Sequence, residues 1–502
     1  MTTHRIRILA ALGALAVVAV ACSSDSTPTS TSAASSSTTS SPPATEAIPT
    51  LITGPVSGGI ELANAALYDL AAVGYVEEEY FIEGDAASFA MAGERTTDGL
   101  WSLTEDEFAS YRTRIIVRRP ADGADFSGVA VVEWLNVSAG RDGDPDWGYL
   151  HQELIREGHA WIGVSAQEVG VSGGDVLLEQ EGVALEGGLI GSDPERYGTL
   201  DHPGDAYSFD IFSQAGRAVR GGDGPDVLGG LELTQLVAAG ESQSAYFLTS
   251  YVNGVHPRAR VFDGFLVHSR GSGSPDIADL GSDEAFGQPV QIRTDLDEPM
   301  LVFETETDLT ELDYLPARQD DTDSVRVWEV AGTAHADSFL LEEVYGLADL
   351  PGDQLASVLD CPAPLNDGPQ HEVIQAGFHH LVDWIRDGTL PPDAPRLEVE
   401  PGDPPVIVRD ELGNALGGIR TPLVDVPVAA LSGDPADGGS EFCFLFGTTT
   451  AFDAGTLAEL YPGPGDYLTA FTAAADDAVD AGFILRPDAD DMIAEAEAAD
   501  PS

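Results

Sequence analysis

The feature that most constrains the fold is a regular alternation of short apolar runs with longer amphipathic runs between residues 128 and 388. Apolar runs of strand length are expected to be buried strands, and the amphipathic runs repeat with helical spacing. Strands are expected at 128–137, 159–167, 233–240, 259–269, 299–307 and 323–332, and helices at 146–158, 207–220, 244–254 and 371–388. Strands that alternate with helices predict parallel β-α-β units, with helices on both faces of the sheet.

The segments around this series differ in character. Between residues 48 and 120 short β-like runs such as 112–119 predict an antiparallel start. Gly- and Asp-rich insertions near 170–203 and 340–464 interrupt the alternation. Lids and substrate loops commonly lie at such places, although a surface loop without function is the more common case. We therefore expect one α/β domain over 48–502, with a mostly parallel sheet and lid-like insertions.

The first residues resemble a targeting signal. A basic start is followed by an apolar run at 8–21, which is too short to span a membrane comfortably. The "AVAC" that ends at Cys22 resembles a bacterial lipobox, so residues 1–21 are expected to be a lipoprotein signal peptide and Cys22 to carry lipid. An ordinary signal peptide cleaved near Ala21 and an uncleaved anchor are the alternatives. Residues 22–47 are rich in Ser, Thr and Pro and predict a flexible tether on the extracytoplasmic side of the membrane.

The charge of the chain limits its possible partners, and its cysteine content bears on disulfide formation. The net charge is −62, and all 23 basic residues are Arg. This balance argues against nucleic acid as a partner and indicates a solvated acidic surface. Cys361 and Cys443 form an even pair in an exported chain, which is compatible with a disulfide. No spacing suggests a metal site, and neither a cofactor nor a protein partner is implied.

The stretch "LVAAGESQSAYFLTSYV" places Ser242 between an apolar run and a helical one. Serine attack on a carbonyl needs a hydroxyl lifted clear of the fold, and a tight strand-to-helix turn provides it. Gly240 and Ser244 are small enough to let the strand and helix approach each other. Ser172 in "GVSGG" matches the literal G-x-S-x-G pattern, but the glycines after it delay any helix. We therefore expect Ser242 to be the nucleophile.

The base and the acid should follow later in the chain. His335 lies just beyond an expected strand, where this architecture places the base, whereas His379 and His380 lie within a helix. The acid should come from "ETETD" after the preceding strand. Asp308 falls in the expected turn and is preferred, with Glu306 close behind. Either carboxylate could instead belong to the acidic surface.

Two backbone N–H groups should stabilise the oxyanion. One is that of Gln243, directly after the nucleophile, and the other should come from Asn136 or Val137 after the first parallel strand. His268 stands at the carboxyl end of another strand, where it could line a substrate pocket or be an uninvolved loop residue.

These motifs together resemble the α/β-hydrolases, and within them a poorly characterised bacterial group known simply as the alpha/beta hydrolase domain. The resemblance rests on "VVEWLNVSAGRD", "GYLHQELIREGHAWIGVSAQ", "GESQSA", "FDGFLVHSRG", "ETETD" and "EVAGTAHAD". It implies the α/β-hydrolase fold and a serine carboxylic ester hydrolase that uses Ser242, His335 and an acid of "ETETD". It does not imply a particular substrate.

The expected function is hydrolysis of small-molecule or polymer esters through an acyl-enzyme, by a protein held to the membrane through a lipid on Cys22. An amidase or peptidase that uses the same triad is one alternative. A non-catalytic, ligand-binding surface lipoprotein is the other.

Overall fold

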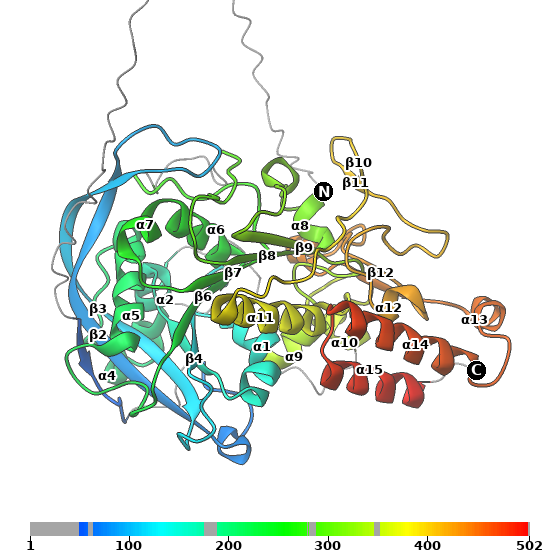
Figure 1. Ribbon diagram of the computed structural model, residues 1–502, viewed down its shortest axis with the longest axis horizontal. Coiled ribbons are helices and arrows are strands. Elements are labelled where there is room, and N and C mark those ends of the chain that lie inside the picture. The colour runs from blue at the N-terminus through cyan, green and yellow to red at the C-terminus, as the bar shows by residue number, and fades with distance from the viewer. Residues whose placement is uncertain are drawn as a thin grey trace, which may run out of the picture. The chain divides into compact units, whose positions relative to one another are not determined.

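One sheet of nine strands organises the computed structural model, which describes residues 50–58, 64–174, 188–278, 280, 288–345 and 352–499. The strand order is β1-β2-β3-β5-β4-β6-β7-β8-β9 (Figure 1). Their bounds are β1 Leu51–Thr53, β2 Tyr75–Met91, β3 Leu103–Pro120, β4 Val129–Trp134, β5 Ala160–Val164, β6 Gln235–Glu241, β7 Gly264–His268, β8 Met300–Glu304 and β9 Val325–Glu329. The lipidation candidate Cys22 and the proposed signal peptide lie outside the described residues.

The alternating part of the chain forms the parallel half of the sheet, as predicted. β4 pairs in parallel with both β5 and β6, and β6 to β9 continue in the same direction. The start of the sheet is antiparallel, since β1, β2, β3 and β5 pair in that sense. The prediction of short runs there was wrong, because β2 and β3 are strands of 17 and 18 residues. Gly84 and Asp85 look like a turn in the sequence, but they continue β2, and a Cβ at Gly84 would collide with the Gln214 side chain.

Alternate side chains of the central strands enter two cores, one on each face of the sheet. Ala130 and Val132 of β4 pack with α5 (Ser208–Gly221) and α6 (Gln243–Ser250). Val129 and Val131 pack on the other face with α1 (Pro145–Arg156) and α11 (Gln370–Asp387). The apolar strands read as continuous hydrophobic runs because both of their faces are covered.

The C-terminal part of the chain extends the second core, which the sequence did not predict. Helices α14 (Asp466–Ala481) and α15 (Arg486–Ala499) lie side by side (Figure 1). They add Phe471 and Met492 to this core. Cys361 and Cys443 are joined in a disulfide, with 5.6 Å between their Cα atoms. Residues 352–499 thus belong to the same packed unit as the sheet.

Both insertions contain secondary structure. The first carries α2 (Glu168–Ser172), α3 (Gly188–Ser192) and α4 (Pro194–Tyr197), and its residues 175–187 lie outside the described ranges. The second carries α9 Ser338–Tyr345, α10 Gly352–Val358, α12 Pro422–Asp425, α13 Ala454–Leu460, and the paired strands β10 Val399–Glu400 with β11 Val406–Ile407 and β12 Ala429–Ser432 with β13 Thr448–Ala451. The remaining helices are α7 (His256–Ala259) and α8 (Glu306–Thr310). Within the described ranges, none of the helices combines the length and apolar character needed to cross a bilayer.

Candidate active site

Ser242 occupies the tight turn between β6 and α6. Its backbone has φ 58° and ψ −121°, a strained conformation for a residue with a side chain. A Cβ at Gly240 would lie 3.1 Å from the backbone of Ser244, so a larger residue there would require the turn to shift by a few tenths of an ångström. The Ser242 N–H donates to the carbonyl of His268 at 2.9 Å, which fixes the turn against β7. Strand, turn and helix therefore present the Ser242 hydroxyl at the carboxyl edge of the sheet, as the sequence predicted.

His335 joins Ser242 to Asp308 in one continuous chain of hydrogen bonds. Its Nε2 lies 2.8 Å from the Ser242 Oγ, and its Nδ1 lies 2.7 Å from Oδ1 of Asp308. Burial lowers the pKa of His335, but the hydrogen bond and charge of Asp308, with Glu241, outweigh burial and hold this pKa above its ordinary value. The imidazole is therefore a stronger base than a free histidine.

Asp308 is oriented by the start of α8. Its Oδ2 accepts the backbone N–H of Thr305 at 2.7 Å and the Thr305 hydroxyl at 2.8 Å. In return the Asp308 N–H donates to the Thr305 hydroxyl oxygen at 3.4 Å, which completes a capping box. Because Oδ2 is held by Thr305, the other carboxylate oxygen is left for His335. Glu304, the last residue of β8, is fully buried, and burial raises its pKa well above the ordinary value.

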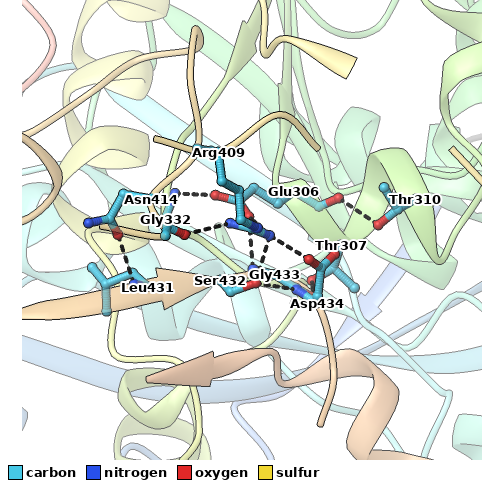
Figure 2. A network of polar contacts seen from close by, with 12 residues as sticks. Glu306, Thr307, Thr310, Gly332, Arg409, Asn414, Leu431, Ser432, Gly433 and Asp434 are labelled. Atoms are coloured by element: carbon cyan, nitrogen blue, oxygen red, sulfur yellow. Dashed lines mark hydrogen bonds and ion pairs between the residues drawn. The ribbon is translucent and has the colours of Figure 1, made fainter. Parts of the chain in front are cut away.

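Glu306, the alternative acid, does not contact His335 and instead ties three segments together (Figure 2). Its Oε1 accepts the N–H of Gly332 at 2.6 Å. Its Oε2 accepts the N–H of Gly433 at 3.0 Å and a guanidinium N–H of Arg409 at 2.9 Å. The prediction of Glu306 as a possible triad acid is therefore wrong, because its oxygens are committed to the backbone and to an arginine.

Arg409 belongs to the same network and links it to the second insertion. Its Nη2 also donates to Asp434 Oδ2 and to the Ser432 hydroxyl, each at 2.6 Å (Figure 2). Thr307 donates its hydroxyl to the carbonyl of Gly433 at 2.7 Å. The segment 409–434 is thus fastened to the turn that bears Asp308.

The backbone hydrogen bonds near Ser242 distinguish between Asn136 and Val137, the two oxyanion candidates in the loop after β4. The Asn136 N–H donates to the carbonyl of Gly143 at 2.9 Å, so it is already engaged. The Val137 N–H makes only a 3.5 Å contact with the side-chain Oε1 of Gln243. Gln243 is the first residue of α6, so its own N–H has no partner within the helix. Val137 and Gln243 are therefore the freer donors.

His268 does not line a substrate pocket, which was one of the two interpretations of its position in the sequence. Its ring is fully buried, with Nδ1 2.9 Å from Oδ1 of Asp146 and Nε2 3.1 Å from the Gln370 amide nitrogen. The ring also makes edge contacts with Tyr149 and Phe303. It supports the site from within the protein.

Two further residues contact the site without having been singled out from the sequence. Glu241 directly precedes Ser242, and its Oε1 lies 3.4 Å from Nε2 of His335. Gln167 lies between β5 and α2, and its side-chain oxygen accepts the side-chain N–H of Gln243 at 2.8 Å. Glu241 could have been found from the sequence, because it directly precedes the nucleophile. Nothing in the sequence around Gln167 indicates its place at the site.

Ser172, which matches the literal G-x-S-x-G pattern, is the last residue of α2 and does not stand on a strand-to-helix turn.

Among the described residues, Glu153, Glu157 and His379 could together approach a metal ion. Glu153 is already bonded to Arg156 and to His379, each at 2.8 Å, so its charge has partners.

Comparisons with known proteins give several similar solved structures. An esterase from Rhizomucor miehei is 11% identical over 61% of this chain and 84% of that chain, with a TM-score of 0.29. A putative dienelactone hydrolase from Klebsiella pneumoniae is 13% identical over 50% and 85%, with a TM-score of 0.26. A serine hydrolase without a lid from Xanthomonas campestris is 14% identical over 52% and 91%, with a TM-score of 0.27. A search of curated proteins gave no match.

The family comparison covers most of the chain. Residues 40–494 match the model of the alpha/beta hydrolase domain family. The sheet order, the turn at Ser242 and the loops that carry Asp308 and His335 all lie within that span. The resemblance inferred from the motifs is confirmed: this chain belongs to the alpha/beta hydrolase domain family and has the α/β-hydrolase fold.

Proposed function

We propose that the protein is a serine hydrolase that cleaves carboxylic esters, with Ser242 as nucleophile, His335 as base and Asp308 as acid. The observation that carries the proposal is the unbroken chain from Asp308 Oδ1 through His335 to Ser242 Oγ, with distances of 2.7 Å and 2.8 Å. A nucleophile, a base and an orienting acid within hydrogen-bonding reach are what acyl transfer requires.

The first half-reaction forms an acyl-enzyme. His335 takes the proton of Ser242 as Oγ attacks the ester carbonyl, and the charge of Asp308 stabilises the imidazolium that results. The N–H groups of Gln243 and Val137 donate to the oxyanion, and the contact between Val137 and the Gln243 side chain is long enough to yield to it. His335 then protonates the alcohol as it leaves.

Water completes the cycle by the same steps. His335 removes a proton from a water molecule, which attacks the acyl carbonyl, and the proton returns to Ser242 Oγ. The residues on this path need no cofactor. The acidic surface, with a net charge of −62, favours neutral or cationic ester substrates at low salt.

Fluorophosphonate labelling with peptide mapping tests the assignment, together with hydrolysis of p-nitrophenyl butyrate. We expect the label at Ser242, and loss of labelling and turnover in Ser242→Ala. Ser172→Ala is the matched control, because Ser172 fits the literal motif but ends α2. A folded wild-type protein that is neither labelled nor active would refute the proposal and favour a binding lipoprotein. Faster turnover of matched anilides than of esters would make it an amidase.

The proposed location is the extracytoplasmic face of a bacterial membrane, with lipid on Cys22. It is supported by the basic start, the apolar run at 8–21 and the small residues before Cys22. Cys22→Ser should move the protein from the membrane fraction to the soluble fraction and abolish incorporation of labelled palmitate. Retention of Cys22→Ser in the membrane would refute the lipid anchor.

A further inference from the structure

The buried carboxyl group of Glu241 contacts the catalytic base His335, but the mechanism proposed above gives it no role. Glu241 is the last residue of β6 and is 4% exposed. Its Oε1 lies 3.4 Å from Nε2 of His335, the same nitrogen that faces Ser242. Its Oε2 accepts the side-chain N–H of Asn136 at 3.3 Å, and Asn136 also donates to the Glu241 carbonyl at 3.2 Å. One carboxyl thus contacts the base and the loop that carries the Val137 N–H.

The groups around Glu241 favour its neutral form. Burial raises its pKa to about 8; the nearby His335 opposes the shift, and Asp146 and Asp308 add to it. Tyr149, which also faces this carboxyl, has its own pKa raised by burial and by acids, so it adds no charge.

Two other titratable groups lie close by. His268 is paired with Glu241 across β6 and β7, and its ring is held by Asp146. Asp337, two residues after His335, accepts the Tyr149 hydroxyl at 3.2 Å, and burial raises its pKa to about 7. In the described part of the chain no arginine contacts Glu241, whereas Arg409 donates a hydrogen bond to Glu306.

We propose that Glu241 is a positioning residue that works as a neutral acid: it holds Asn136 and the oxyanion loop through Oε2 and directs the proton of His335 Nε2 towards the leaving group through Oε1. The proposal rests on the proposed function, because it assigns Glu241 a part in the same proton transfer.

The hydrogen bonds indicate how the neutral acid acts. Since Oε2 accepts from Asn136, the acid proton resides on Oε1. An O–H at 3.4 Å is too far from Nε2 to displace the Ser242 hydroxyl at 2.8 Å. Once His335 is protonated, this neutral O–H group is a much weaker acceptor for the Nε2–H than a carboxylate oxygen would be. The proton therefore stays available to the departing alkoxide.

Ionisation of Glu241 reverses both effects. A carboxylate Oε1 accepts the Nε2–H of the imidazolium in a charge-assisted bond and retains the proton on His335. It also places a negative charge beside the loop of Asn136 and Val137, where the oxyanion forms. Catalysis should therefore decline as Glu241 loses its proton.

The experiment compares kcat and KM of the full-length wild type and Glu241→Gln for p-nitrophenyl butyrate between pH 6 and 10. Wild-type kcat should fall roughly tenfold between pH 7 and pH 9.5 with little change in KM, because the neutral form becomes scarce. Glu241→Gln imitates the neutral acid and cannot ionise, so its kcat should not fall between pH 7 and pH 9.5. At pH 7 its kcat should be somewhat lower than that of the wild type. Glu241→Ala should lose most of its kcat at every pH.

Glu372→Gln is the matched control. Glu372 is a buried carboxyl on α11, with a pKa that burial raises well above the ordinary value. Its removal should leave the alkaline decline in place. Asp337 titrates in all variants, so the difference between profiles isolates Glu241.

A second measurement does not depend on turnover. The raised pKa of Glu241 means that its favourable contribution to stability is full below the pKa of the unfolded chain and is lost as pH rises to about 8. The melting temperature of Glu241→Gln relative to wild type should therefore increase between pH 5 and pH 8 and then stay constant.

The outcomes separate the two proposals. Turnover by wild type with the same alkaline decline in Glu241→Gln, or a constant melting-temperature difference, would overturn the role of Glu241 alone. A folded wild type without turnover would overturn the proposed function and the role of Glu241 with it.

Discussion

Replacement of Arg409 by methionine should destabilise the protein in a pH-dependent way, because Arg409 is the counter-charge of the fully buried Glu306. The Arg409 side chain is 20% exposed, and its Nη2 lies 2.9 Å from Glu306 Oε2. Removal of one partner of a buried ion pair typically costs about 3–5 kcal/mol. Glu306 keeps the N–H groups of Gly332 and Gly433, so we expect a smaller loss of about 2–3 kcal/mol at pH 8. Asp434 is 46% exposed, so the loss of its contact adds little.

The dependence on pH follows from the state of Glu306. Burial already raises its pKa, and Arg409 is the main influence that lowers it, so Arg409→Met should raise this pKa further. An acid with a raised folded-state pKa contributes stability that is present at low pH and lost as pH rises through that pKa. The cost of Arg409→Met should therefore be smaller at pH 5 than at pH 8 by about 1 kcal/mol or more.

Urea denaturation of wild type and variant at both pH values measures this cost. Arg420→Met is the control, since Arg420 is similarly exposed at 23% but pairs with the surface acids Asp410 and Asp425. Its cost should be below about 1 kcal/mol and independent of pH. Equal losses for Arg409→Met and Arg420→Met, or a loss for Arg409→Met that does not change with pH, would refute the reasoning.

Three other changes have definite expected results. Asp308→Asn should lower kcat for p-nitrophenyl butyrate by about 10³–10⁴, because His335 loses its orienting acceptor, whereas Glu306→Gln should cost less than about tenfold; similar losses would contradict the assignment of the acid. Ser242→Gly should raise the free energy of unfolding by about 1 kcal/mol relative to Ser242→Ala, because glycine relieves the strain at φ 58°, and equal melting temperatures would exclude that strain. Replacement of Cys361 and Cys443 by serine should lower the free energy of unfolding by up to about 4–5 kcal/mol for a sequence separation of 82, and unchanged urea midpoints would contradict this.

The nucleophile was predictable from the sequence because the signal is local. Gly240, Ser242 and Ser244 lie within five residues, and the strand before them and the helix after them are visible in the same stretch. The long hairpin of β2 and β3 was not predictable in this way, because Gly84 and Asp85 interrupt its pattern. There, pairing between strands overrides local propensity.

The distance from the end of β8 does not choose between Asp308 and Glu306 as the triad acid, because both lie in the first turn of α8. The spacing of Thr305 and Asp308 matches a capping box and would have indicated which carboxylate faces inward over the helix start. The partner of Glu306, however, is Arg409, which lies 103 residues further along the chain. Only the fold brings that charge to the site.

The acids beside the triad differ in their basic partners. The chain has 85 acidic residues and 23 basic ones, so most of its carboxyl groups cannot each have an arginine. Glu306 contacts Arg409 and Asp308 contacts His335, so each of these two acids has a basic partner. Glu241 has no such arginine, shares His335 with Asp308, and has a pKa of about 8. A positively charged or protonatable partner is therefore placed where a carboxylate must orient a base or hold two loops, whereas the acid beside Ser242 has no arginine among the described residues.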